Sequence, residues 1–164
     1  MRRRSRGMVG AAACAVLAVG CTATGVSPRA CTEIGSPAGV SVTVARDAVV
    51  PAMTLTLRIC QTECVEQLVD LLPGSTTVGE TCDSDDPDAS CSASSSPDGT
   101  MVGFVDVSTL TVGDVRVRGE LRAGASRTRL AEVTVPAEAT YPNGRDCPAG
   151  GPQASIRVTD TGLR

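Results

Sequence analysis

The chain of 164 residues carries 15 arginines against 18 acidic residues, a formal charge of −3, and it contains neither histidine nor lysine. These absences exclude Ser–His and Cys–His nucleophile pairs, imidazole metal ligands and lysine Schiff bases. Tryptophan is also absent, and phenylalanine and tyrosine occur once each. Aromatic platforms for sugars or bases are therefore missing, and we expect no nucleic-acid binding.

The first twenty residues have the three parts of a secretory signal peptide. Four arginines occur within the first six positions, and an apolar stretch of 12 residues follows at 8–19, before Gly20. A basic head, a short apolar middle and a small residue before the cleavage point are typical of export signals. A membrane-spanning helix needs about 20 apolar residues. We therefore expect residues 1–20 to form a cleaved signal helix and not a permanent anchor.

The residues Leu17-Ala18-Val19-Gly20-Cys21 resemble the lipobox of bacterial lipoproteins, although this family more often has leucine where Ala18 stands. The resemblance implies that a dedicated peptidase cuts before Cys21, that the Cys21 thiol carries a diacylglycerol with chains such as palmitate, and that the new amino group is open to acylation. One acyl chain binds a membrane only marginally and two bind stably, because each buried methylene contributes about 0.8 kcal/mol. The alternative is an ordinary signal peptide cut near Ala13 or Gly20.

The chain that remains after cleavage is one domain in length. Residues 21–164 number 144 and hold 11 arginines against 18 acidic residues, a formal charge of −7. This length fits a single domain. We expect residues 21–30 to be a lipidated tether and residues 31–164 to be a folded domain outside the cytoplasm, held at the outer face of the cell membrane.

Six cysteines lie within the expected domain, and an even number in an exported chain indicates disulfides. They allow fifteen pairings, of which local geometry favours one. Cys60 and Cys64 can face each other across a hairpin, Cys82 and Cys91 flank an acidic turn-rich segment, and Cys31 and Cys147 remain. A metal–thiolate site is the weaker interpretation, because the C-x3-C spacing has no second close pair and no histidine.

Alternating apolar and polar residues predict a series of β-strands. Residues 40–44 and 53–59 alternate strictly, which is typical of strands with one buried face. Residues 65–72 are a third strand, or else end in one helical turn at 68–72, and Pro73-Gly74 should end that element. Residues 79–99 are a Ser/Asp/Pro-rich excursion in which no strand pattern is visible.

The β pattern resumes beyond this excursion. Residues 102–107 and 112–121 are expected strands, the second with Val115, Val117 and Leu121 on one face, and residues 130–135 and 154–158 complete the set. Seven to eight short strands with close turns predict an all-β antiparallel sandwich. The predicted core is aliphatic, with Phe104 as its one bulky aromatic.

A second resemblance covers most of the chain after the signal peptide. The segment 30–40 (ACTEIGSPAGV), the C-x3-C hairpin, and the closing segment 141–153 with Cys147 are similar to uncharacterised lipoproteins of high-GC Gram-positive bacteria. This resemblance implies an extracytoplasmic location and an immunoglobulin-like sandwich. It implies no activity.

The densest group of candidate ligands is acidic, and two interpretations of it stay open. Asp83, Asp85, Asp86 and Asp88 lie between Cys82 and Cys91, and carboxylate oxygens at close spacing are what Ca²⁺ requires. The order of an EF-hand is absent, so a solvated acidic loop closed by a disulfide is the preferred interpretation. A Ca²⁺-dependent binding module that uses residues 83–88 is the alternative.

Three other patterns have structural interpretations that we prefer. The serines of residues 92–96 have no base to activate them, and they are typical of a turn region. Asp106 and Asp114 could form a carboxylate pair for glycoside hydrolysis, but almost no aromatic residue is available to hold a sugar. Tyr141 precedes a Pro-Asn-Gly turn, where it either pins a loop or forms an exposed contact.

These observations predict a non-enzymatic, lipid-anchored module that binds a protein or another envelope component. Export and anchoring are well indicated, and catalytic patterns are missing. No cofactor is expected. An enzyme that uses acidic residues alone is the third and weakest hypothesis.

Overall fold

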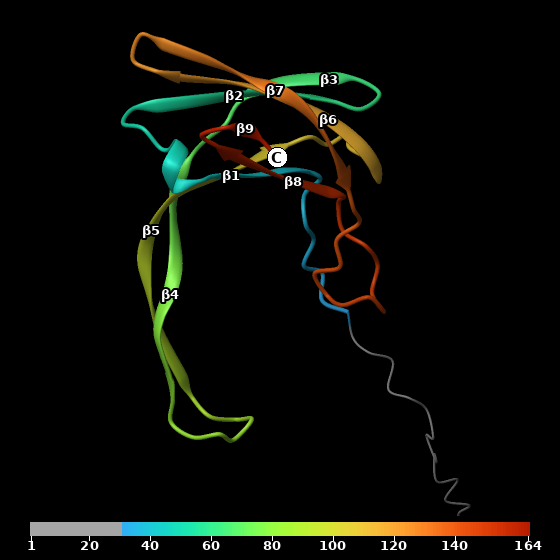
Figure 1. Ribbon diagram of the computed structural model, residues 1–164. Coiled ribbons are helices and arrows are strands. Elements are labelled where there is room, and N and C mark those ends of the chain that lie inside the picture. The colour runs from blue at the N-terminus through green and yellow to red at the C-terminus, as the bar shows by residue number, and fades with distance from the viewer. Residues whose placement is uncertain (1–30) are drawn as a thin grey trace, which may run out of the picture. The chain divides into compact units, whose positions relative to one another are not determined.

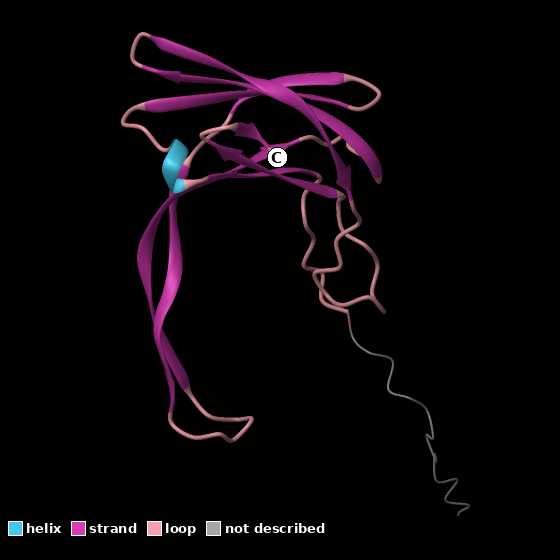
Figure 2. Cartoon of the chain, in the orientation of Figure 1, coloured by secondary structure: helices cyan, strands magenta, loops and turns pink. Residues whose placement is uncertain are grey.

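The computed structural model describes residues 31–164, which fold into two β-sheets (Figure 1). The predicted signal helix, the lipidated Cys21 and the tether of residues 21–30 lie outside the described residues. Within the described part, no helix is both long and apolar enough to cross a membrane. A single 3-10 turn, η1 (Arg46–Ala48), is the helical element that Figure 2 shows.

The nine strands of residues 31–164 are divided between a five-stranded and a four-stranded sheet. In spatial order, the five-stranded sheet contains β4 (Leu72–Cys82), β5 (Cys91–Asp106), β1 (Gly39–Val44), β8 (Gln153–Thr159) and β9 (Gly162–Leu163). The four-stranded sheet contains β3 (Cys64–Leu68), β2 (Met53–Cys60), β6 (Gly113–Ala123) and β7 (Ser126–Ala137). Neighbouring strands are antiparallel except for β1 and β8, which are parallel. The prediction of an all-β fold with two sheets is confirmed.

The core lies between the sheets and is built by the predicted alternation of side chains. The inward residues of β1 and β2 are at most 2% exposed, namely Val40, Val42, Val44, Leu55, Leu57 and Ile59. Val115 and Val117 of β6 are fully buried, and Leu121 packs against them from a partly buried position. Each such burial stabilises the fold by about 1.5–3 kcal/mol. The side chains that fill the sandwich are aliphatic.

Phe104 does not belong to this core, so that part of the prediction is wrong. Strand alternation points Val105 inward, where it is buried, and Phe104 outward, where it is 36% exposed. The ring covers Gly39 of the neighbouring strand so closely that a Cβ at Gly39 would lie 2.6 Å from its Cζ atom. The Phe104 ring thus covers the backbone of Gly39, which is buried.

The region around residues 68–99 also differs from the prediction. Strand β3 ends at Leu68 without a helical turn, and β4 begins at Leu72 and runs straight through Pro73-Gly74. The expected strand-free excursion is in fact a long hairpin of β4 and β5, which Figure 1 shows extending away from both sheets. Residues 75–95 of this hairpin are exposed apart from the half-buried Ala89, so no apolar alternation marked them in the sequence.

Three disulfides fasten the fold, and they join the pairs that the sequence analysis favoured. Cys60–Cys64 links adjacent strands at the β2–β3 turn, and Cys82–Cys91 closes the tip of the β4–β5 hairpin. Cys31–Cys147 ties the start of the described chain to the long loop between β7 and β8. Backbone hydrogen bonds hold the same two segments together. In one of them, the Gly151 N–H donates to the Ser36 carbonyl oxygen at 2.9 Å.

Candidate functional site

The outer face of the four-stranded sheet gathers most of the positive charge of residues 31–164. The residues that alternate with the buried valines and leucines point outward here, and many are arginines. This surface, which we call the arginine face, consists of Arg58, Arg116, Arg118, Arg122, Arg127 and Arg129 together with Glu66, Glu120 and Glu132. Its formal charge is +3.

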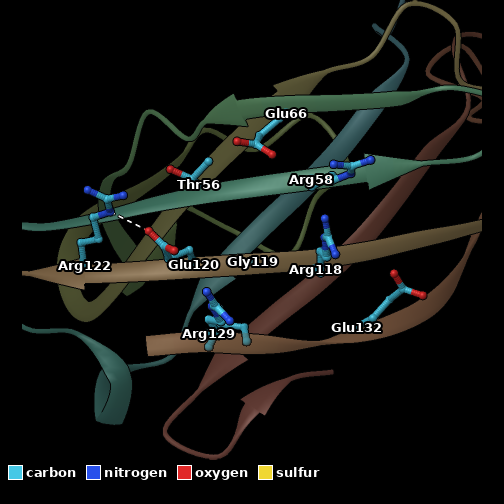
Figure 3. Close-up of a pocket in the computed structure, with 10 residues that line it drawn as sticks. Thr56, Arg58, Glu66, Arg118, Gly119, Glu120, Arg122, Arg129 and Glu132 are labelled. Carbon is cyan, nitrogen blue, oxygen red and sulfur yellow. Dashed lines mark hydrogen bonds and ion pairs between the residues drawn. The ribbon is translucent and has the colours of Figure 1, made fainter. Parts of the chain in front are cut away.

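A hollow of about 700 Å³ lies in the arginine face (Figure 3). Its lining comes from all four strands, with Arg58 and Thr56 on β2, Arg118 on β6 and Glu66 on β3. Gly119 lines the hollow through its backbone, and a Cβ at this position would point to the core side, within 3.1 Å of the buried Leu57 and Leu130 side chains. The hollow is lined largely by charged groups.

Glu120 is the most strongly paired acid of this surface. Its Oε1 atom accepts a hydrogen bond from Arg122 Nε at 2.6 Å and lies 3.2 Å from Arg127 Nε. The hydrogen bond from Arg122, and then the charges of Arg127 and its neighbours, hold the pKa of the Glu120 carboxyl below its ordinary value of 4.5. The carboxylate is therefore ionised at neutral pH and neutralises part of the positive charge around it.

Arg58 and Arg118 form the least neutralised part of the hollow. They stand directly opposite each other on β2 and β6, and Figure 3 shows them side by side, with Glu66 on β3 and Glu132 on β7 to either side. Within the described chain neither makes an ion pair within 4.0 Å, whereas Glu132 lies 3.9 Å from Arg116. Like charges directly opposite on adjacent strands destabilise a sheet. A bound anion would remove that repulsion.

The charge of residues 31–164 is strongly segregated. All 18 acidic residues and ten of the arginines lie in this part of the chain. Outside the arginine face, four arginines stand against fifteen acidic residues. Because an excess of one sign over a surface attracts partners of the opposite sign, this positive patch on an acidic domain is suited to an anionic partner.

The predicted acidic loop forms the turn between β4 and β5. Asp83, Asp85, Asp86 and Asp88 lie at the exposed tip of the β4–β5 hairpin. No group of three or more acidic or cysteine side chains among residues 31–164 is arranged to hold a metal ion. The Asp86 backbone instead accepts a hydrogen bond from the N–H of Ala89, at 2.9 Å, which stabilises the turn.

The other candidates lie in separate places. Asp106 and Asp114 are exposed on strands of different sheets, β5 and β6. The serines of residues 92–96 form one strand of the exposed hairpin. Tyr141 is 39% exposed, and the Arg145 guanidinium lies 5.4 Å from the centre of its ring, so the ring helps to hold the turn that follows.

A smaller hollow of about 230 Å³ lies beside the Cys60–Cys64 turn. Ile59, Val107 and Leu110 form its apolar wall, and Gln61 forms part of its rim. The Gln61 side chain is engaged, because its Oε1 accepts hydrogen bonds from the Thr111 N–H and hydroxyl at 2.9 Å. Glu63 is the one charged residue among those that line this hollow.

The arginine face is not evident from the sequence pattern. In the pattern Val115-Arg116-Val117-Arg118, the valines predict a strand with one buried face. The pattern does not show that the outward arginines belong to a larger group. Their grouping depends on the pairing of β6 with β2 and β7, which the sequence pattern alone does not give. Comparison with known protein families, curated proteins and solved structures finds no significant match for this chain.

Proposed function

We propose that this protein is a lipid-anchored, extracytoplasmic binding module without enzymatic activity, and that its arginine face takes an anionic partner. One observation carries the proposal. Arg58 and Arg118 stand opposed in a hollow on an otherwise acidic domain, without an ion pair among the described residues. Repulsion between these two arginines lowers the stability of the free protein. An anion bound between them relieves the repulsion and so forms a more stable complex.

The extracytoplasmic location is supported by the three disulfides, because such bonds persist in oxidising compartments. The anchor is supported by the lipobox resemblance at Cys21 and the signal-like residues 1–20. The resemblance to lipoproteins of high-GC Gram-positive bacteria agrees with both, and we include it in the proposal.

We further propose that the sandwich is immunoglobulin-like. The β2–β3 and β6–β7 hairpins meet through β2 and β6 in one sheet, and β1, β5 and β4 are neighbours in the other. In immunoglobulin domains, likewise, strands B, E and D are neighbours in one sheet, and strands C, F and G are neighbours in the other. One difference is that β8 lies next to β1 and runs parallel to it, with β9 beyond it at the edge of the sheet.

A binding role without catalysis is supported by the chemistry of the hollow. Its titratable side chains are arginine and glutamate. Arginine stays protonated in proteins and cannot act as a base, but its planar donors match carboxylate and phosphate groups well. These residues suit recognition of an anion better than transfer of a proton.

Cell fractionation tests the anchor. The unaltered protein should sediment with membranes, and Cys21→Ala should release it in soluble form, because the thiol that carries the lipid is removed. Mass spectrometry of the unaltered protein should detect the acyl chains. An unmodified amino terminus at any other residue would contradict the proposal.

Crosslinking in intact cells tests the arginine face. The double variant R58E/R118E should lose the partner that the unaltered protein captures. R157E/R164E changes charge by the same amount at exposed positions of the other sheet and should retain the partner. If both double variants capture the same partner as the unaltered protein, the arginine face is not the binding surface.

A further inference from the structure

The outer part of the β4–β5 hairpin contributes nothing to the core. We call residues 75–97 the arm, and none of them is buried. A two-stranded ribbon that is exposed on both faces is marginally stable by itself. The disulfide Cys82–Cys91 and the side-chain hydrogen bond between Thr81 and Ser92, at 3.1 Å, fasten its far end. The arm is thus a reinforced projection without a role in packing.

The charge of the arm is entirely negative. Glu80 and the four aspartates of residues 83–88 form an acidic tip, and no arginine occurs between residues 72 and 97. The tip is also restrained next to the disulfide, because the Asp83 N–H donates to the Ser90 carbonyl oxygen at 3.0 Å. Ordering before binding lowers the entropy that an interaction must overcome.

The acidic tip cannot contact the arginine face of its own chain. Figure 1 shows the arm leaving the five-stranded sheet on the side opposite β2, β3, β6 and β7. The arginine face is the outward side of those four strands. Any contact between the two surfaces must therefore join different molecules.

We propose that the acidic tip of one copy docks into the hollow of the arginine face of a second copy. This inference rests on the proposed function, because it names the anionic partner of the same surface. Five carboxylates of the tip meet a surface that has three arginines in excess, and Arg58 and Arg118 gain ion pairs, which neither forms within 4.0 Å among the described residues although Glu66 stands opposite Arg58 on β3. The hollow of about 700 Å³ has room for several carboxylate side chains of a turn.

The predicted interface is head-to-tail. Each copy offers one tip and one hollow at different places, so the contact is heterologous and can continue from copy to copy. Because the attraction is between exposed charges, it should weaken strongly at high salt. These two properties distinguish the proposal from a symmetric dimer formed through an apolar patch.

Sedimentation velocity on residues 31–164 tests the inference, since this unit contains the whole described core and all three disulfides. At low salt, the unaltered domain should form species larger than dimers as its concentration rises. The tip variant D83N/D85N/D86N/D88N and the face variant R58Q/R118Q should each associate about tenfold more weakly or not at all. D47N/D70N/D106N/D160N removes as many exposed carboxylates elsewhere and should associate like the unaltered domain.

Mixing gives the decisive measurement. The tip variant keeps an intact hollow and the face variant keeps an intact tip, so an equal mixture should form one-to-one dimers and nothing larger. Circular dichroism and a count of free thiols establish that each variant is folded. If a variant associates alone as the unaltered domain does, or if the mixture or the unaltered domain stays monomeric, the inference is overturned.

The outcome is separable from that of the proposed function. If association fails while R58E/R118E still loses its crosslinked partner in cells, the arginine face binds an anion other than the acidic tip. If association fails and crosslinking is unchanged as well, both proposals fall.

Discussion

Glu120 neutralises two neighbouring arginines, and this pairing makes a testable contribution to stability. Its pKa is lower in the folded protein than the ordinary value of 4.5, which we take for the unfolded chain. The contribution is therefore fully present above the unfolded value and is lost as the pH falls through the lower, folded value. We expect Glu120→Gln to lower the melting temperature at neutral pH, and the difference from the unaltered protein to vanish in acid.

Melting curves between neutral and acidic pH measure this effect. Glu138→Gln is the matched control, because it removes one exposed carboxylate outside the arginine face. If the two variants show the same dependence on pH, the contacts of Glu120 with Arg122 and Arg127 do not stabilise the fold.

Arg118 differs from Glu120 because it forms no ion pair among residues 31–164. It stands opposite Arg58 on the neighbouring strand, and no carboxylate oxygen lies within 4.0 Å of it in that part of the chain. Replacing it with threonine removes the repulsion and should raise the free energy of unfolding by about 0.2–1 kcal/mol. The same change should weaken binding of an anionic partner. Arg122→Thr makes an identical side-chain change but removes a partner of Glu120, so it should give no such gain. Urea unfolding of both variants measures the difference.

The strands of the sandwich were predictable wherever one face is buried. Val40, Val42 and Val44 alternate with polar residues because only one face of β1 packs against the core. The same reason holds for Leu55 and Leu57 of β2. The sequence therefore predicts which residues of each strand face the core. It predicts much less about which strands are neighbours, since strand pairing depends on contacts between distant segments.

The arm and the arginine face were missed for this reason. Residues 75–81 and 91–95 have no buried side, so nothing in their pattern distinguished a strand from a polar loop. The arginines on β2, β6 and β7 become one surface only through the register of those strands, in which Arg58 stands opposite Arg118. Phe104 was misplaced because aromatic character was taken as a sign of burial, whereas strand parity assigns the inward place to Val105.

The arm should open without loss of the sandwich when its disulfide is removed. In C82S/C91S, we expect amides of residues 75–95 to exchange quickly with solvent, because only ribbon hydrogen bonds and exposed side chains remain. Amides of β1 and β2 should keep their protection, and the melting temperature should change little. Hydrogen exchange followed by mass spectrometry measures both regions. Equal loss of protection in β1 and β2 would mean that the arm is part of the cooperative core.

The domain has a negatively charged end, the acidic tip of the arm, and a positively charged end, the arginine face. Figure 1 places the arm and the four-stranded sheet on opposite sides of the five-stranded sheet, so the acidic tip and the arginine face point apart. Acidic residues elsewhere give residues 31–164 a net negative charge, so the arginine face is the part of the surface that attracts anionic groups most strongly. This polarity is what the proposed docking of one copy onto the next requires.

The disulfide Cys31–Cys147 is the covalent link that spans nearly the whole domain. It closes a loop with a sequence separation of 116 residues, whereas Cys60–Cys64 closes one of 4. In the chain-entropy model these loops correspond to about 5 and about 2 kcal/mol. We therefore expect C31A/C147A to lower the free energy of unfolding by more than C60A/C64A does, although Cys60 is buried and Cys31 is exposed. Urea unfolding of the two double variants under identical conditions gives the comparison. The reverse order would show that local packing at the β2–β3 turn, and not closure of the long loop, dominates the stability of the sandwich.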